Sequence, residues 1–294
     1  MHKKALLGIF FLFFTVNIVA QTSFYSGFID KYPIEVLTNV YSDGVANAIY
    51  AYKNFDEPIV IDGALKKNSL VLFEKDASGN KSATFRFEQF DAKNNTLVGT
   101  WTDLKSQKTL KVNLTKSFDL DNENEKAWTN REIIQPVSIN NKYFKLILSK
   151  SADDYSAKVV GVKILEKKTD KLIQQIDLDC QLLGINSIGV GDFNFDGLTD
   201  FSVFEASYAG ANTSSLYFLL DPKTGEYFNS EFSGVSLEFD PKLKRIYERN
   251  SSASSITTAT YKVVNNKMVV TERHCLVWNE KKQDYVERPI KECE

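Results

Sequence analysis

The chain has 294 residues, with 36 Lys and Arg against 38 Asp and Glu, so its net charge of −2 is too small to indicate a nucleic acid or a charged membrane surface as partner. Its two histidines, His2 and His274, are too few for a catalytic zinc, and no nucleophile motif accompanies them. We therefore expect a protein that is not an enzyme, and its 21 Phe and 13 Tyr favour β-strands.

The first residues have the three-part pattern of a secretory signal peptide, predicted over residues 1–20. Lys3 and Lys4 form a positive start, residues 5–20 are apolar and uncharged, and Ala20 is a small residue at the expected cleavage point. A membrane anchor is the alternative, but the apolar run is shorter than the roughly 20 residues that span a bilayer. We expect a periplasmic or secreted protein with no stable membrane insertion after cleavage.

The segment 22–116 reads as a series of short strands separated by turns. Asp43-Gly44 and Ser78-Gly79 are turn signals between apolar runs, and residues 110–114 alternate cleanly between apolar and polar. The runs fall at 26–29, 34–37, 48–52, 59–63, 69–74, 85–90, 97–101 and 110–114. This spacing predicts an N-terminal β domain, built as a small antiparallel barrel or sandwich.

A change of composition marks the predicted domain boundary. Residues 117–135 are acidic, polar and weakly periodic, so we expect a linker there, with a short helix at about 123–131. Residues 136–294 are again rich in strand patterns and predict a second antiparallel β domain, propeller-like or a twisted sheet. The whole chain is therefore expected to be all-β.

The C-terminal part predicts two local features. Asn265-Asn266 joins two apolar runs as a two-residue turn of the kind that tolerates positive φ. Cys275 and Cys293 flank a segment that reads as a hairpin, and export permits disulfides, so we favour a bond between these two cysteines. Cys180 would then be a buried free thiol.

The most specific motif is DFNFDGLTD at 192–200. It places oxygen side chains and a glycine in the order of a calcium-binding loop, because alternating acids on a tight loop bring several oxygens to one point. The predicted Ca²⁺ ligands are Asp192, Asn194, Asp196, the carbonyl of Leu198, and Asp200.

The loop departs from an EF-hand in two respects. The twelfth position is Val203 where a bidentate Glu is expected, and the flanking residues read as strands, so we expect a calcium-binding β-hairpin with Glu205 as a further oxygen donor. The alternatives are an acidic turn that binds nothing and a pair of catalytic carboxylates for glycoside hydrolysis. A calcium loop accounts better for Asp192 and Asp196, because both would be held as ligands.

Residues 185–275 resemble the family of exported, calcium-binding inhibitors of peptidoglycan-cleaving enzymes, which includes immunity proteins. The resemblance rests on the order GDFNFDGLTDFSVF, EASYAGANTSS, LYFLLDPKTGEYF, LEFDPKLKRI and YKVVNNKMVV. It implies calcium at the loop and a protein partner, a lysozyme-like peptidoglycan hydrolase, whose cleft is plugged by a loop.

That inhibitory loop would correspond to residues 208–215. Its candidate binding residues are Tyr208, Gly210, Asn212, Thr213 and Ser214. An aromatic side chain at a loop tip is a favourable anchor, and the calcium loop just before it would stiffen its base. The alternative is an extracytoplasmic binding module for a glycan or partner protein, in which calcium is purely structural.

Overall fold

The structure is a computed structural model and describes residues 21–120 and 125–293. The predicted signal peptide lies outside these residues. The first eight strands form a closed antiparallel barrel in which each strand pairs with the next and β1 pairs with β8. They are β1 (Gln21–Ile29), β2 (Tyr32–Val40), β3 (Val45–Tyr52), β4 (Ile59–Lys66), β5 (Ser69–Lys75), β6 (Lys81–Phe87), β7 (Thr96–Asp103) and β8 (Thr109–Asp119).

The barrel forms because alternate side chains point into it. Along β8, Val112 and Leu114 are buried while their sequence neighbours are exposed, which is the alternation seen in the sequence. Glycine permits close strand contact at Gly63, where a Cβ would lie 1.9 Å from the carbonyl oxygen of Val71. The predicted N-terminal barrel is thus confirmed.

Three further antiparallel sheets follow the barrel. The first has the order β12-β11-β10-β9, the second β13-β14-β15-β16 and the third β17-β18-β19-β20-β21. A single 3₁₀ turn, η1 (Ile290–Glu292), ends the described chain. The strands are β9 (Trp128–Ile139), β10 (Lys142–Lys150), β11 (Lys158–Glu166), β12 (Leu172–Gln181), β13 (Ile188–Gly191), β14 (Asp200–Ser207), β15 (Thr213–Leu220), β16 (Tyr227–Asn229), β17 (Glu238–Asp240), β18 (Arg245–Ser251), β19 (Ser255–Val264), β20 (Lys267–Asn279) and β21 (Asp284–Arg288).

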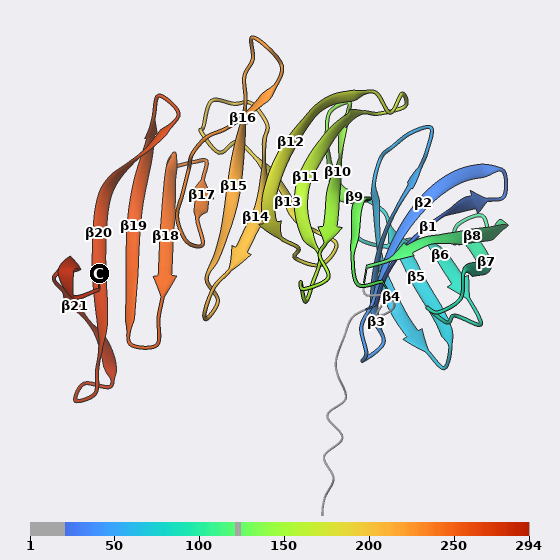
Figure 1. Cartoon of the computed structure of the whole chain (residues 1–294), viewed down its shortest axis with the longest axis horizontal. Helices are drawn as coiled ribbons and strands as arrows, with labels where there is room; N and C mark the ends of the chain where they lie inside the picture. The colour runs from blue at the N-terminus through green and yellow to red at the C-terminus, as the bar shows by residue number, and fades with distance from the viewer. Residues whose placement is uncertain (1–20, 121–124, 294) are drawn as a thin grey trace, which may run out of the picture.

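The barrel and the three sheets are arranged in a row, like successive blades (Figure 1). One apolar cluster joins Leu37 and Ile49 on the outside of the barrel to Phe144 of β10 and Phe201 of β14. A second cluster, with Tyr217 and Tyr261, fills the space between the β13–β16 and β17–β21 sheets. The core is therefore a series of layers between neighbouring elements.

The segment predicted as a linker is partly strand. Residues 117–119 end β8, and β9 begins at Trp128, so residues 128–131 are extended and do not form the expected helix. The polar composition arises because β9 is an edge strand, and none of its first five residues is buried. Edge strands carry polar residues on their solvent-facing side, which weakens the apolar period.

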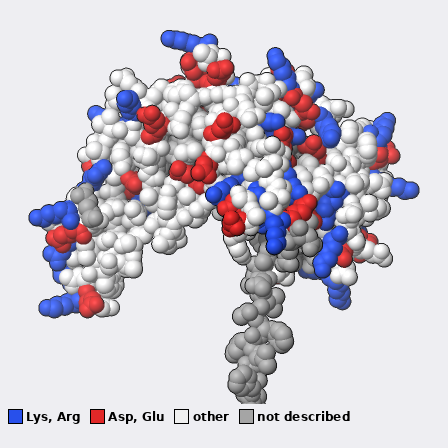
Figure 2. Space-filling view, viewed as in Figure 1, with Lys and Arg blue, Asp and Glu red and all other residues white. Residues whose placement is uncertain are grey.

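Two local predictions in the C-terminal part are confirmed. Asn265 and Asn266 both have positive φ, 51° and 57°, in the turn between β19 and β20. Cys275 and Cys293 form a disulfide, with Cα atoms 5.9 Å apart, and Cys180 is free and buried. Basic and acidic side chains are interspersed over the face seen in Figure 2, as the small net charge suggests.

Candidate functional site

The 192–199 segment between β13 and β14 is a tight turn stabilised by its own acidic side chains. The carboxylate of Asp192 accepts hydrogen bonds from the N–H groups of Asp196, at 3.0 Å, and Gly197, at 2.8 Å. The side-chain oxygen of Asn194 accepts from the same Asp196 N–H at 3.2 Å. Oxygens of Asp192 and Asn194 therefore converge on one backbone nitrogen. Gly197 provides the sharp bend, with φ of 89°.

Asp200 has a different environment from the other predicted ligands. It is fully buried, and its two oxygens accept from the N–H groups of Phe193 and Leu220, each at 2.9 Å. Burial raises its pKa to about 6, and the charges of Asp196 and Asp192 act in the same direction. Asp200 thus ties the start of the loop to β15.

The turn also packs on the neighbouring β17–β21 sheet. Phe193 contacts Phe239, with ring centroids 4.8 Å apart, and the amide of Asn194 donates to the side-chain oxygen of Asn266 at 3.0 Å. The ammonium of Lys244 donates to the carbonyl of Phe195 at 3.1 Å. The loop therefore joins the two sheets as well as connecting two strands.

The donor set of this turn fits calcium in its chemistry. Ca²⁺ prefers six to eight oxygen ligands, and Asp192, Asn194 and Asp196 offer carboxylate and amide oxygens on one turn. Each carboxylate oxygen has two lone pairs, so one that accepts an N–H can still contact a cation. Within residues 21–120 and 125–293, however, no three His, Cys, Asp or Glu side chains gather into a metal-holding group. Asp200, like Asp192, accepts backbone N–H groups on both oxygens, and it differs from the other three side chains in being fully buried.

The calcium loop does not brace the candidate inhibitory loop, contrary to our expectation. The two loops lie at opposite ends of β14, because 192–199 precedes Asp200 and 208–212 follows Ser207 (Figure 1). Eight residues of extended strand separate them by about 25 Å. The two loops are close in sequence, and we expected them to be close in space. They are apart because β14 is extended and one loop lies at each of its ends.

The candidate binding loop is shorter than the sequence suggested. Thr213 and Ser214 already belong to β15, so only residues 208–212 connect the strands. Tyr208 is 52% exposed, and its hydroxyl lies 3.2 Å from the hydroxyl of Ser214. Gly210 adopts φ of 77°, which favours glycine at the bend.

Asn212 anchors this connection to the next sheet. Its amide nitrogen donates to the carbonyl of Ser251 at 2.8 Å and to the side-chain oxygen of Asn250 at 3.1 Å. Its side-chain oxygen accepts from the Ser251 N–H at 3.0 Å, and the residue is buried. Asn212 is therefore an internal anchor. Among the five candidate binding residues, Tyr208 is the one with an exposed aromatic side chain that a partner could contact.

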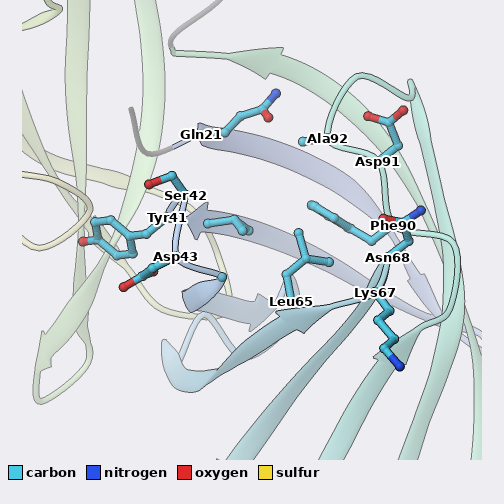
Figure 3. Close-up of a pocket in the computed structure, with 12 residues that line it drawn as sticks. Gln21, Tyr41, Ser42, Asp43, Leu65, Lys67, Asn68, Phe90, Asp91 and Ala92 are labelled. Atoms are coloured by element: carbon cyan, nitrogen blue, oxygen red, sulfur yellow. The ribbon is translucent and has the colours of Figure 1, made fainter. Parts of the chain in front are cut away.

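One end of the barrel contains a cavity that no sequence motif indicates. It has a volume of about 560 Å³, with Leu65 and Phe90 toward its centre and the side chains of Gln21 and Asp91 at its rim (Figure 3). Its lining comes from four separate segments: the start of β1 and the residues around 40–44, 65–68 and 90–92. Only barrel closure brings these together, so no local motif signals the cavity.

Comparison with known proteins leaves the family open. No model of a protein family matches this sequence, and no curated protein matches it. A solved structure described as a Xanthomonas type IV secretion system related protein is similar over 92% of this chain and 99% of that chain, with 12% identity and a TM-score of 0.30. Similarity at that score assigns no function. Residues 21–120 and 125–293 contain no helix with the length and apolar character needed to cross a membrane.

Proposed function

We propose that this chain is an exported, calcium-binding inhibitor or immunity protein that blocks a lysozyme-like peptidoglycan hydrolase. The observation that carries the proposal is the connection 208–212, here called the Tyr208 tip. Tyr208 offers an exposed aromatic side chain, and its N–H donates to the carbonyl of Asn212, which is itself locked to the next sheet. A pre-ordered tip loses little conformational entropy on binding, and tyrosine is a favourable anchor in an enzyme cleft. The resemblance of residues 185–275 to exported hydrolase inhibitors supports the same role.

Calcium has an indirect part in this mechanism. Bound at Asp192, Asn194 and Asp196, with the Leu198 carbonyl and Asp200 completing the set, it would neutralise the acidic turn. The turn contacts Phe239 and Asn266 on the adjacent sheet, so the ion would stabilise the junction of the two sheets that also hold the Tyr208 tip at its far end. Occlusion itself requires only the tip.

The test is an inhibition assay against purified lysozyme-type hydrolases, with calcium and with a chelator. We expect the wild-type protein to slow at least one of these enzymes and Tyr208→Ala to weaken inhibition by about tenfold or more, which is typical of an anchor residue. Tyr155→Ala is the matched control, because Tyr155 is 96% exposed and lies in the β10–β11 turn of a different sheet. Equal inhibition by the two variants would refute occlusion by Tyr208.

A second candidate function is an extracytoplasmic binding module for a glycan or partner protein, with structural calcium. The barrel-end cavity favours it, because apolar side chains lie beneath a rim that includes Gln21, Asn68 and Asp91 (Figure 3). Amide and carboxylate groups over an apolar floor suit a polar ligand. Binding that persists in Tyr208→Ala and is lost in Asn68→Ala would favour the module over the inhibitor.

A further inference from the structure

The end of the barrel opposite the cavity contains a carboxylate surrounded by aromatic rings. Oε1 of Glu74 accepts hydrogen bonds from the hydroxyl of Tyr50 at 2.6 Å and from the indole N–H of Trp101 at 2.5 Å. These three residues come from β3, β5 and β7, and all face the barrel interior or its mouth. Both contacts use neutral donors, so they leave the charge of the carboxylate uncompensated.

No cation of the described chain lies within ion-pairing distance of this carboxylate. Glu74 takes part in none of the ion pairs formed among residues 21–120 and 125–293. Glu35, another partly buried carboxylate of the barrel, contrasts with it, since Lys145 lies 3.0 Å away and Lys53 3.7 Å away. A carboxylate held in aromatic surroundings without a counter-charge favours the approach of a cation.

The neighbouring rings offer faces for such a cation. Tyr50 and Tyr52 have ring centroids 5.7 Å apart, and Tyr32 lies 6.2 Å from Tyr52 in a nearly perpendicular orientation. Tyr52, Glu74 and Trp101 are partly exposed, and Tyr32 is 44% exposed, so the cluster is accessible from solvent.

The chain itself places an ammonium group at this mouth. The Nζ atom of Lys31 lies 5.6 Å from the centroid of the Tyr32 ring, within the range of a cation–π interaction. Burial and the charge of Glu74 raise the pKa of Tyr52, so its hydroxyl remains neutral and the negative charge of the cluster belongs to Glu74.

We propose that the Glu74 mouth of the barrel binds an organic ammonium group, with Glu74 supplying the charge and Tyr32, Tyr52 and Trp101 supplying ring faces. Carboxylate plus aromatic faces is the arrangement that recognises alkylammonium ions, because it combines charge neutralisation with a surface that accepts N-methyl or methylene groups. The ammonium can belong to a lysine side chain or to a small quaternary amine. The site is independent of calcium and of the Tyr208 tip.

The experiment follows the indole N–H signals of the protein, which has three Trp, during titration with tetramethylammonium chloride. Sodium chloride at equal ionic strength is the reference, and Trp101→Phe assigns the signal. We expect a saturable shift of the Trp101 signal only with the organic cation. A parallel titration with Nα-acetyl-lysine amide distinguishes the two sources: tighter binding of this compound indicates a lysine side chain, and tighter binding of tetramethylammonium indicates a quaternary amine.

Variants make the assignment specific. Glu74→Gln keeps the shape and one acceptor oxygen but removes the charge, and we expect it to weaken binding about tenfold. Glu88→Gln is the control, since Glu88 is an exposed carboxylate that follows β6 and pairs with Arg86. If Glu74→Gln does not fold, as judged by circular dichroism, Tyr52→Leu decides, with the same expected loss. A shift that does not saturate, or one of equal size in wild type and the folded variant, overturns the proposal.

Discussion

Asn212 and Ser251 exchange two hydrogen bonds: the Ser251 N–H donates to the Asn212 side-chain oxygen at 3.0 Å, and the Asn212 amide donates to the Ser251 carbonyl at 2.8 Å. The side chain of Asn212 thus occupies the place of a neighbouring strand and connects the β13–β16 sheet to the β17–β21 sheet. This pair, and not the calcium loop, holds the base of the Tyr208 tip.

Replacing Asn212 by Ala should therefore destabilise the protein and loosen the tip. The change leaves the partly buried backbone groups of Ser251 without this partner, which costs about 1 kcal/mol. Denaturant unfolding measures the loss, and amide exchange at residues 208–212 should accelerate. Asn141→Ala is the control, because Asn141 is exposed, and its stability should stay within about 0.5 kcal/mol of wild type. Unchanged exchange in Asn212→Ala would argue against the anchor.

Calcium should raise the melting temperature of the wild-type protein. An ion that binds only the folded state stabilises it by about 2.7 kcal/mol at a concentration 100 times its Kd. Calorimetry with calcium and with chelator measures the effect, and the double variant Asp192→Asn, Asp196→Asn should abolish it.

Asp221→Asn serves as the control for the calcium experiment. Asp221 accepts a hydrogen bond from the Lys223 N–H at 2.8 Å in an ordinary acidic turn. Removing its negative charge should therefore leave the calcium-dependent rise in melting temperature unchanged. Loss of the response in this control as well would mean that calcium acts through general surface charge.

The disulfide between Cys275 and Cys293 should contribute strongly to stability. It closes a loop with a sequence separation of 18, and loops of that size contribute about 3 kcal/mol by restricting the unfolded chain. Cys275→Ser with Cys293→Ser should lower the free energy of unfolding by that amount. A reductant should lower the free energy of unfolding of the wild-type protein equally and should leave that of the variant unchanged. Cys180 should stay unreactive toward thiol reagents in the folded state, because burial raises its pKa to about 11.

His274 should titrate above its ordinary pKa of 6.5. The carboxylate of Glu287 lies 2.8 Å from its Nδ1 atom and favours the charged imidazolium, which raises the pKa of His274. A histidine with a raised pKa stabilises the fold below pH 6.5, and this contribution disappears as the pH rises through the folded-state pKa. NMR titration of the imidazole should show the shift, and Glu287→Gln should return the pKa toward its ordinary value. An identical titration curve in that variant would exclude Glu287 as the cause.

The barrel and the β9–β12 sheet should unfold together. Leu37 of the barrel is fully buried in the apolar cluster that includes Phe144 and Phe201 of the later sheets. Leu37→Ala should therefore lower the free energy of unfolding by about 2–5 kcal/mol. It should shift a single unfolding transition that the barrel and the sheet share. Calorimetry checks this, with Val98→Ala as control, since Val98 is 65% exposed on the barrel. Two separate transitions, with only one displaced, would show independent domains.

Several features followed from the sequence because they depend on neighbouring residues. The alternation at Val112 and Leu114 indicated a barrel strand. Asn265-Asn266 indicated the turn between β19 and β20, since both residues tolerate positive φ. The order of residues in 192–200 indicated a tight loop between two strands, which the structure contains, and calcium at this loop stays a prediction. The pairing of Cys275 with Cys293 followed from the hairpin between them.

Other features depend on contacts between residues far apart in the chain, and only the tertiary structure decided them. The polar start of β9 looked like a linker because edge strands need no apolar period. Asn212 looked like a binding residue because its partner is 39 positions away, and Glu74 carried no signal because Tyr50 and Trp101 reach it only when the barrel closes. Local backbone preferences are encoded within a few residues, whereas which loops meet, and which end of a strand each occupies, is determined by how the sheets pack.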